Sequence, residues 1–351
     1  MSQSRKEVCK AIKNSPEKEL RPILTLLNGD ASWLMSFPRP RADQVSTGKA
    51  YYHIVYEPWL QGDASMFGAW FFNVALSAKA AITDVRGIEE LIREIEEAAA
   101  CHLPTIQTQP AEKQGLYKGN IDVIMLAFHF VDHVHEPTLR TFDLDIPVIA
   151  TPEAAAIIRP WNHFKTICLS HDLDSSAKTW RSKDLHAELL PDWLTVIRLP
   201  SHAVLNFCTA LIWTHETDME EIHETILISP HGTHLDQGPL DAFLNAEPKT
   251  ELLTMLHGLK ESYGIRGVNK LGAKGGLALY RKIGGTKSWI LNHDNDFTYS
   301  GVWLWISRTT DLPRSIEWAL EEERKQNEGS QGLEVPNFIQ IENGGVLVLE
   351  R

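Results

Sequence analysis

The stretch from Ile121 to Leu139, I-D-V-I-M-L-A-F-H-F-V-D-H-V-H-E-P-T-L, constrains the fold more than any other part of the chain. The apolar run Val123–Leu126 predicts a strand, a cluster of His and Asp follows it, and Pro137 favours a helix directly afterwards. Open α/β sheets bind their ligands where strands lead into helices in this way. Asp132 and His133 can reach one ion only if the backbone turns there, because neighbours in a continued strand point to opposite faces.

Composition limits the class of protein. The chain has 351 residues, enough for one large domain or two small ones, and 43% of them are hydrophobic, as in proteins that bury a core. A formal net charge of −12 argues against the basic surface that grips a phosphate backbone, so we expect no nucleic-acid partner. No run of about 18 apolar residues occurs, so we expect no membrane span. Composition leaves the oligomeric state open.

Cysteine usage and the N-terminus predict the compartment. The four cysteines are scattered and form no C-x-x-C pair, and Cys168 and Cys208 lie in apolar runs that predict buried thiols. This pattern fits a reducing compartment. The first ten residues, M-S-Q-S-R-K-E-V-C-K, carry no apolar signal core. We therefore expect a cytoplasmic protein.

Hydrophobic periodicity predicts alternating strands and helices. The expected strands are residues 32–37, 51–60, 123–126, 147–150, 166–169, 194–199, 207–213, 225–229, 288–292 and 338–349. The expected helices are residues 87–100, 151–158 with Thr151 as N-cap, 240–244, 252–262, 276–283 and 315–326. The run Gly272–Gly276 could hold a phosphate at a helix start, but a turn is the favoured interpretation. The strands and helices fall into two halves of the chain, each with strands and flanking helices. This arrangement predicts an α/β fold with two mixed β-sheets flanked by helices.

The segment F-H-F-V-D-H resembles the H-x-H-x-D-H signature of the metallo-β-lactamase superfamily. Asp132 and His133 agree with the signature, whereas Phe128 and Phe130 replace its two leading histidines. His129 stands between them, one residue out of phase, and such a shift turns a strand side chain to the other face. The resemblance implies the αββα sandwich of that family, in which the leading pair belongs to the first of two metal positions and the Asp-His pair to the second.

The resemblance extends from about residue 24 to about residue 311. It leaves residues 1–23 as an N-terminal extension and residues 312–351 as a C-terminal appendage of a helix and a strand. The runs W-L-M-S-F-P-R, E-P-W-L-Q-G, S-P-H-G and N-H-D are similar to a UlaG-like, lactonase-like group that is common in filamentous fungi. That group also has an aromatic residue for the second signature histidine but keeps the first, so Phe128 is a departure of this chain.

The family places its later ligands at the ends of later strands. Three histidines here, His202, His231 and His293, each come directly after an expected strand. The resemblance therefore implies one divalent ion held by Asp132, His133, His231 and His293. His202 belongs to the family's first metal position and lacks partners there, so we expect it to line the pocket or to be an ordinary hydrogen-bonded histidine.

Three imidazoles and a carboxylate suit Zn²⁺ first, and also Fe²⁺ or Mn²⁺. If His231 binds the ion, four protein ligands leave no position for water, as in structural zinc sites. If it does not, Asp132, His133 and His293 leave room for a water whose pKa is near ~7, and His231 could act as general base or hold an oxyanion. Asp132 and His231 are the candidate catalytic residues.

Other interpretations remain open from the sequence. Asp132 and His133 could cap the following helix, because Asp is common at helix starts. His231 could be an ordinary hydrogen-bonded histidine. His293 could form a surface pair with Asp294, or be a ligand that this carboxylate orients.

Two functions follow. The first is a mononuclear metal-dependent hydrolase acting on a small-molecule lactone, ester or phosphodiester, for example in specialised metabolism. The second is a catalytically impaired pseudo-enzyme of the same fold that binds a ligand or a partner. Phe128 and Phe130 discriminate between them, because their rings either line an open pocket or fill the space of the missing ligands.

Overall fold

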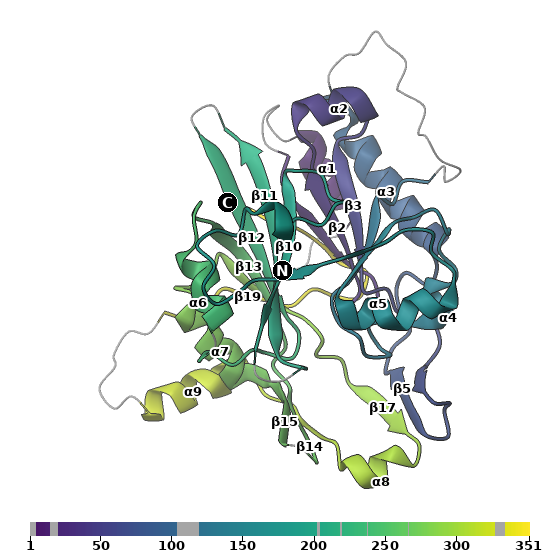
Figure 1. Ribbon diagram of the computed structural model, residues 1–351, viewed down its shortest axis with the longest axis vertical. Helices are drawn as coiled ribbons and strands as arrows, with labels where there is room; N and C mark the ends of the chain where they lie inside the picture. Colours follow the sequence, from purple (N-terminus) through teal and green to yellow (C-terminus); the bar gives the residue numbers. More distant parts are fainter. Residues whose placement is uncertain are drawn as a thin grey trace. The chain divides into compact units, whose positions relative to one another are not determined.

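The computed structural model describes residues 5–14, 20–103, 119–201, 204–217, 220–236, 238–265, 267–326 and 334–351. They divide into two compact units, each built around a seven-stranded sheet (Figure 1). The first unit comprises Met1–Ala64, Ala75–Leu169 and Ile341–Glu350. The second comprises Ser65–Val74, Ser170–Gln340 and Arg351.

The sheet of the first unit is mixed, with the strand order β20-β1-β2-β3-β6-β7-β8. Its strands are β1 (Ile23–Leu26), β2 (Trp33–Pro38), β3 (Tyr51–Tyr56), β6 (Val123–Leu126), β7 (Val148–Ala150), β8 (Ile167–Leu169) and β20 (Val346–Val348). The pairs from β20 to β3 are antiparallel, and the pairs from β3 to β8 are parallel. Because β3 and β6 are parallel neighbours, the residues that follow them emerge side by side at one edge of the sheet.

Helices accompany this sheet. They are α1 (Arg5–Asn14), α2 (Arg41–Thr47), α3 (Val85–Ala99), α4 (Glu136–Leu139) and α5 (Pro152–Ile158), with the 3₁₀ turns η1 (Ala100–His102) and η2 (Arg159–Trp161). The apolar face of α3 lies in the core of the unit, as its spacing predicts: Ile88, Leu91, Ile92 and Ile95. Asp84 caps α3, and Thr151 caps α5 as expected.

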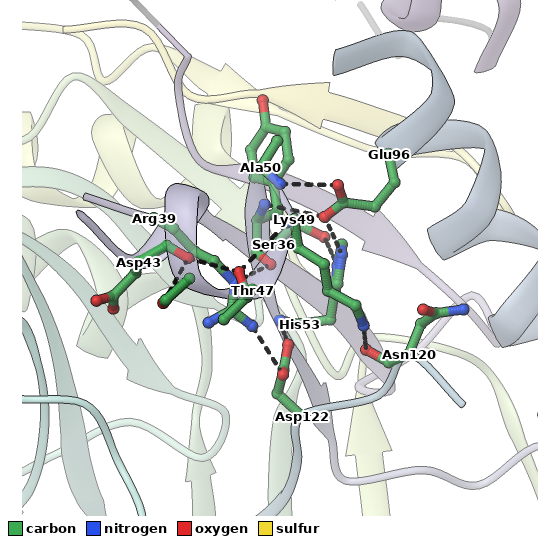
Figure 2. Close-up of polar contacts among 12 residues, drawn as sticks. Ser36, Arg39, Asp43, Thr47, Lys49, Ala50, His53, Glu96, Asn120 and Asp122 are labelled. Atoms are coloured by element: carbon green, nitrogen blue, oxygen red, sulfur yellow. Dashed lines mark hydrogen bonds and ion pairs between the residues drawn. The ribbon is translucent and has the colours of Figure 1, made fainter. Parts of the chain in front are cut away.

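A partly buried polar network joins α3 to β3 (Figure 2). The carboxylate of Glu96 accepts hydrogen bonds from the backbone N–H groups of Ala50 and Tyr51 at 2.8 and 2.9 Å. Its Oε1 also lies 3.1 Å from Nε2 of His53. Burial raises the pKa of Glu96, but the bonds from His53 and the two N–H groups outweigh burial and bring the pKa below its usual range. The network therefore holds β3 in place on the sheet.

The sheet of the second unit has the strand order β19-β16-β13-β12-β11-β10-β9. Its strands are β9 (His171–Asp172), β10 (Leu194–Pro200), β11 (Phe207–Glu216), β12 (Glu221–Ser229), β13 (Glu251–His257), β16 (Ser288–Leu291) and β19 (Phe338–Ile339). β10, β11 and β12 pair antiparallel, whereas β12, β13, β16 and β19 are parallel. The parallel strands again carry the residues after them to one edge.

Helices and two small sheets complete the second unit. The helices are α6 (Gly238–Asn245), α7 (Gly272–Lys282), α8 (Trp303–Ser307) and α9 (Ile316–Gln326), with the 3₁₀ turn η3 (Lys183–Leu185). The small sheets have the orders β15-β14-β18 and β17-β5-β4. Their strands are β4 (Ala64–Met66), β5 (Phe72–Leu76), β14 (Glu261–Gly264), β15 (Gly267–Leu271), β17 (Phe297–Ser300) and β18 (Thr310–Leu312).

Three local predictions are wrong. Residues 338–349 form two strands and not one, because β19 belongs to the sheet of the second unit and β20 to that of the first. Residues 252–262 form no helix, since they contribute to β13 and to the start of β14. β13 is a central parallel strand, and the continuous apolar run of such a strand does not distinguish it from a buried helix. The run Gly272–Gly276 is not a turn but the beginning of α7. There a Cβ on Gly276 would lie 2.4 Å from the ring of Trp289, so glycine permits close packing of helix on sheet.

The expected α/β class, with two mixed sheets flanked by helices, is confirmed. Across the described stretches, no helix combines the length and the apolar character needed to cross a bilayer. None of the four cysteines forms a disulfide, and Cys208 is buried as expected. Cys168 is only half-buried, because it lies on β8 at the edge of its sheet.

Candidate metal-ligand residues

The backbone of the first unit turns shortly after β6. The N–H of His133 donates to the carbonyl of Phe130 at 2.9 Å, and Oδ2 of Asp132 lies 3.7 Å from Nε2 of His133. The turn thus brings the carboxylate of Asp132 and the imidazole of His133 to the same side of the backbone. Without such a turn, the two neighbouring side chains could not reach one ion. The N-cap of α4 is His135, so the alternative that Asp132 and His133 cap this helix is wrong.

Glu57 orients the ring of His133. It follows β3, the parallel neighbour of β6, and its Oε2 lies 2.6 Å from Nδ1 of His133, with both side chains buried. Its φ of 45° is in the left-handed region, which is uncommon outside glycine, and its N–H donates to the carbonyl of Met125. A carboxylate on Nδ1 fixes the tautomer of a histidine and directs Nε2 toward a metal.

The charges around His133 favour a cation. Burial lowers the pKa of His133, but the carboxylates of Glu57 and Asp132 outweigh burial and raise the pKa to about 9. The buried Oε1 of Glu57 has no hydrogen-bond partner among the described residues. Two carboxylates beside one imidazole carry an excess of negative charge, and a divalent ion would neutralise it.

Phe128 and Phe130 lie close to His133. The ring of Phe128 is buried and meets the ring of His133 edge-on at a centroid distance of 4.8 Å. Phe130 stacks on Phe128 at 5.4 Å and is 38% exposed. Phe128 is therefore a core residue, whereas Phe130 forms part of the surface. The ring of His129 lies 5.1 Å from both phenylalanine rings.

In the second unit, His231 and His293 lie side by side. His231 comes shortly after β12 and His293 shortly after β16, and these strands flank β13 in the parallel part of the sheet. Their rings are stacked, with centroids 5.0 Å apart and planes at 7°, and both residues are buried. The two positions at strand ends, recognised in the sequence, are thus brought together. That they bind a metal remains a prediction.

The loop that carries His293 is held in an unusual conformation. His293 has a φ of 56°, in the left-handed region that non-glycine residues rarely adopt. Nζ of Lys270 donates to its carbonyl at 3.3 Å. Oδ1 of Asp294 accepts the backbone N–H groups of Leu259 and Lys260 at 2.8 and 2.6 Å, while burial raises the pKa of this carboxyl. Asp294 therefore anchors the loop, and the alternative of a surface His-Asp pair is wrong.

No further candidate residue from the sequence joins the pair Asp132 and His133 or the pair His231 and His293 among the described residues. His202 lies outside the described residues. A cavity of about 410 Å³ in the second unit is lined by residues other than the candidate ligands: Asp172, Leu173, Asp174, Ser175, Pro200, Gly238 and Pro239. Sequence reasoning did not identify the contact of Glu57 with His133, although the E-P-W run at the end of β3 was a signal for it. No local pattern indicated the role of Lys270.

Neither a family model nor a curated protein matches the chain. Among solved structures, isothiocyanate hydrolase from Delia radicum gut bacteria has a TM-score of 0.50 and 13% identity, covering 93% of this chain and 99% of that chain. A possible metal-dependent hydrolase from Veillonella parvula DSM 2008 has a TM-score of 0.49 and 9% identity, covering 94% and 100%. The metallo-β-lactamase fold protein YhfI from Bacillus subtilis has a TM-score of 0.38 and 10% identity, covering 93% and 99%.

At these identities the likeness concerns the fold alone. The chain shares its overall fold with the isothiocyanate hydrolase and has the expected α/β class, with one mixed sheet in each of its two units.

Proposed function

We propose that the chain is a metal-dependent hydrolase that uses one divalent ion. The observation that carries this proposal is the buried, stacked pair of His231 and His293 at the ends of parallel strands. Ligand sites of α/β sheets lie at this edge. Histidine binds a metal through a ring nitrogen of its neutral imidazole, and the pair places two such rings beside each other.

We assign Asp132 and His133 to the same ion, as the resemblance to the family implies. The support from the first unit is the contact of Glu57 with Nδ1 of His133 and the excess of carboxylate charge there. Imidazoles with a carboxylate suit Zn²⁺ first and Fe²⁺ or Mn²⁺ next.

When bound, such an ion polarises a carbonyl or phosphoryl oxygen and makes water a better nucleophile. Asp132 is the proposed base that accepts the proton of the attacking water, and His231 takes this role if it is not a ligand. The proposed substrate is a small-molecule lactone, ester or phosphodiester, in keeping with the UlaG-like group that the sequence resembles. We further propose that the protein acts in specialised metabolism and in the cytoplasm. The absence of disulfides among its cysteines fits a reducing compartment.

A second candidate function is that of a pseudo-enzyme that binds a ligand or partner without hydrolysis. The buried ring of Phe128 favours it, because this ring lies 4.8 Å from His133 where the resembled group keeps a histidine. The exposure of Phe130 favours a hydrolase instead, since a ring that is 38% exposed offers an aromatic surface to a substrate.

The first test is metal content, measured by inductively coupled plasma mass spectrometry on untagged protein purified without chelator. About one ion per chain is expected for the wild type, with loss in His231→Ala and in His293→Ala. His186→Ala is the matched control, because Nε2 of this histidine donates to the backbone carbonyl of Leu190 at 3.0 Å and the residue is no candidate ligand. Absence of metal after zinc, iron and manganese are each added back would refute the metal site.

A protein with metal would then be assayed for hydrolysis of a lactone, an ester, a phosphodiester and an isothiocyanate, the last because of the isothiocyanate hydrolase that shares the fold. Turnover that disappears with chelator and returns with metal supports the enzyme. A full complement of metal without turnover of any substrate class supports the pseudo-enzyme.

A further inference from the structure

An aromatic surface lies in the second unit. Its residues are far along the chain from Asp132 and His133, the candidate metal ligands of the first unit. Two segments form it, residues 65–74 with β5 and residues 297–307 with β17 and α8 (Figure 1). The N–H groups of Val302 and Trp303 donate to the carbonyls of Trp70 and Phe71 at 3.0 and 2.9 Å. Gly301 permits this approach, since a Cβ there would lie 2.4 Å from the carbonyl oxygen of Phe71.

The side chains of this aromatic face surround Phe71. Its ring packs against those of Phe67, Trp70 and Trp303 at centroid distances of 5.5, 5.7 and 5.6 Å. The outer members are strongly exposed, with Phe67 at 78%, Trp70 at 69% and, on α8, Trp305 at 83%. Ile306 is exposed as well. Single exposed apolar residues are ordinary, but a cluster from two distant segments marks an interaction site.

The two segments that form the aromatic face also lack charged residues. Neither residues 64–78 nor residues 297–307 contain Asp, Glu, Lys or Arg, although these make up 23% of the whole chain. The chain as a whole has a net charge of −12. A second copy of the chain or an anionic bilayer would therefore be repelled at long range, whereas an uncharged surface would not.

The shape of the side chains favours lipid over protein. Side chains that are about four-fifths exposed project from the surface, and a rigid protein partner would need pockets that match each of them. Fluid lipid adapts to such projections without a preformed pocket. Tryptophan is also the residue that concentrates at the bilayer interface, where its ring is apolar and its indole N–H stays among the headgroups.

We propose that this aromatic face inserts into the surface of a zwitterionic phospholipid bilayer, with Phe67, Trp70 and Trp305 as the inserted side chains. Binding rests on apolar burial, so it holds the protein at the membrane surface reversibly. The proposal is independent of the metal site, because it uses none of the candidate ligands.

The experiment is co-sedimentation of the full chain with phosphatidylcholine vesicles, over a range of lipid concentrations and at low and high salt. The wild type is expected to partition onto the vesicles, about equally at both salt concentrations, and more weakly when phosphatidylserine is included. Trp70→Ser with Trp305→Ser is expected to lower the partition coefficient at least about tenfold. Leu144→Ser with Ile157→Ser, two exposed apolar residues of the first unit, is the matched control and should not change it.

A wild type that remains in the supernatant at every lipid concentration overturns the proposal, as does unchanged partition of the tryptophan variant. Size-exclusion chromatography tests the main alternative, in which a second copy of the chain binds to the aromatic face. A wild-type dimer that becomes a monomer in the tryptophan variant would assign the face to a second copy and overturn the lipid assignment. The melting temperature of the tryptophan variant should equal that of the wild type, because the substituted positions are exposed. If it falls, the vesicle assay is repeated with Phe67→Ser, an independent position of the aromatic face.

Discussion

The imidazole rings of His231 and His293 lie nearly parallel, 5.0 Å apart, although 62 positions separate the two residues along the chain. Each ring follows a parallel strand, and the two strands are separated in the sheet only by β13. His293 adopts a left-handed backbone conformation that the surrounding loop contacts maintain. Such conformations tend to be retained where a side chain must point in one direction, which agrees with a role as a ligand.

Replacement of His293 by Asn should separate the ligand role from the backbone role. Asn tolerates the left-handed region better than most residues, so the metal-free variant should melt within about 3 °C of the metal-free wild type. It lacks the imidazole, so metal affinity should fall at least about 100-fold. Calorimetric zinc titration and thermal melts in chelator measure the two effects. Retained zinc affinity would exclude His293 from the site.

Glu57→Gln should weaken metal binding without removing a proposed ligand. The variant keeps an acceptor for Nδ1 of His133 but loses the negative charge that makes the ring a better donor, so affinity should fall about 10–100-fold. Competition with a chromophoric chelator measures this change. The matched control is Glu224→Gln, a buried glutamate whose Oε2 lies 3.1 Å from Nε2 of His215. An equal effect of both substitutions would assign the loss to general destabilisation and not to His133.

The buried His257 should make stability depend on pH. Burial lowers its pKa from 6.5 to about 4, only partly offset by the hydrogen bond that Nδ1 donates to the carbonyl of Gly258. The unfolded chain therefore binds a proton at this residue between pH 6.5 and about 4, whereas the folded chain does not. The free energy of unfolding should accordingly fall as pH decreases through this window, by roughly 3 kcal/mol from this group.

His257→Asn isolates that contribution, because Asn can donate the same hydrogen bond and does not titrate. Urea denaturation of both proteins at several pH values measures it. The stability of the wild type relative to the variant should decrease as the pH falls from neutral to about 4. Parallel curves would mean that the ring is hydrated or protonated in the folded state.

The two phenylalanines beside His133 should differ in their effect on stability. Phe128 is fully buried against the rings of His133 and Phe130, so Phe128→Ala should lower the free energy of unfolding by about 3–5 kcal/mol. Phe130 is more exposed, and Phe130→Ala should cost about 1 kcal/mol or less. Denaturant midpoints measure both changes. Similar losses for the two variants would contradict the assignment of Phe128 to the core and Phe130 to the surface.

Several features could be predicted from the sequence because they depend on neighbours along the chain. The apolar face of α3, the cap at Thr151 and the strand before the Asp-His pair all follow from periodicity and capping. The histidines after strands were also visible, since parallel strands carry such residues to a common edge. The error at residues 252–262 has the same origin, because a fully buried strand lacks the alternation that identifies it.

By itself, then, the sequence determined the α/β class, the positions of most strands of the two large sheets, and the residue types that could bind a metal. Only the tertiary structure decided which distant side chains meet: Glu57 with His133 across 76 positions, and Lys270 with the carbonyl of His293. It also decided that Phe128 is buried while Phe130 is exposed. The physical reason is that periodicity and capping arise within a few residues, whereas contacts between distant segments depend on strand order and register, which the whole chain sets together.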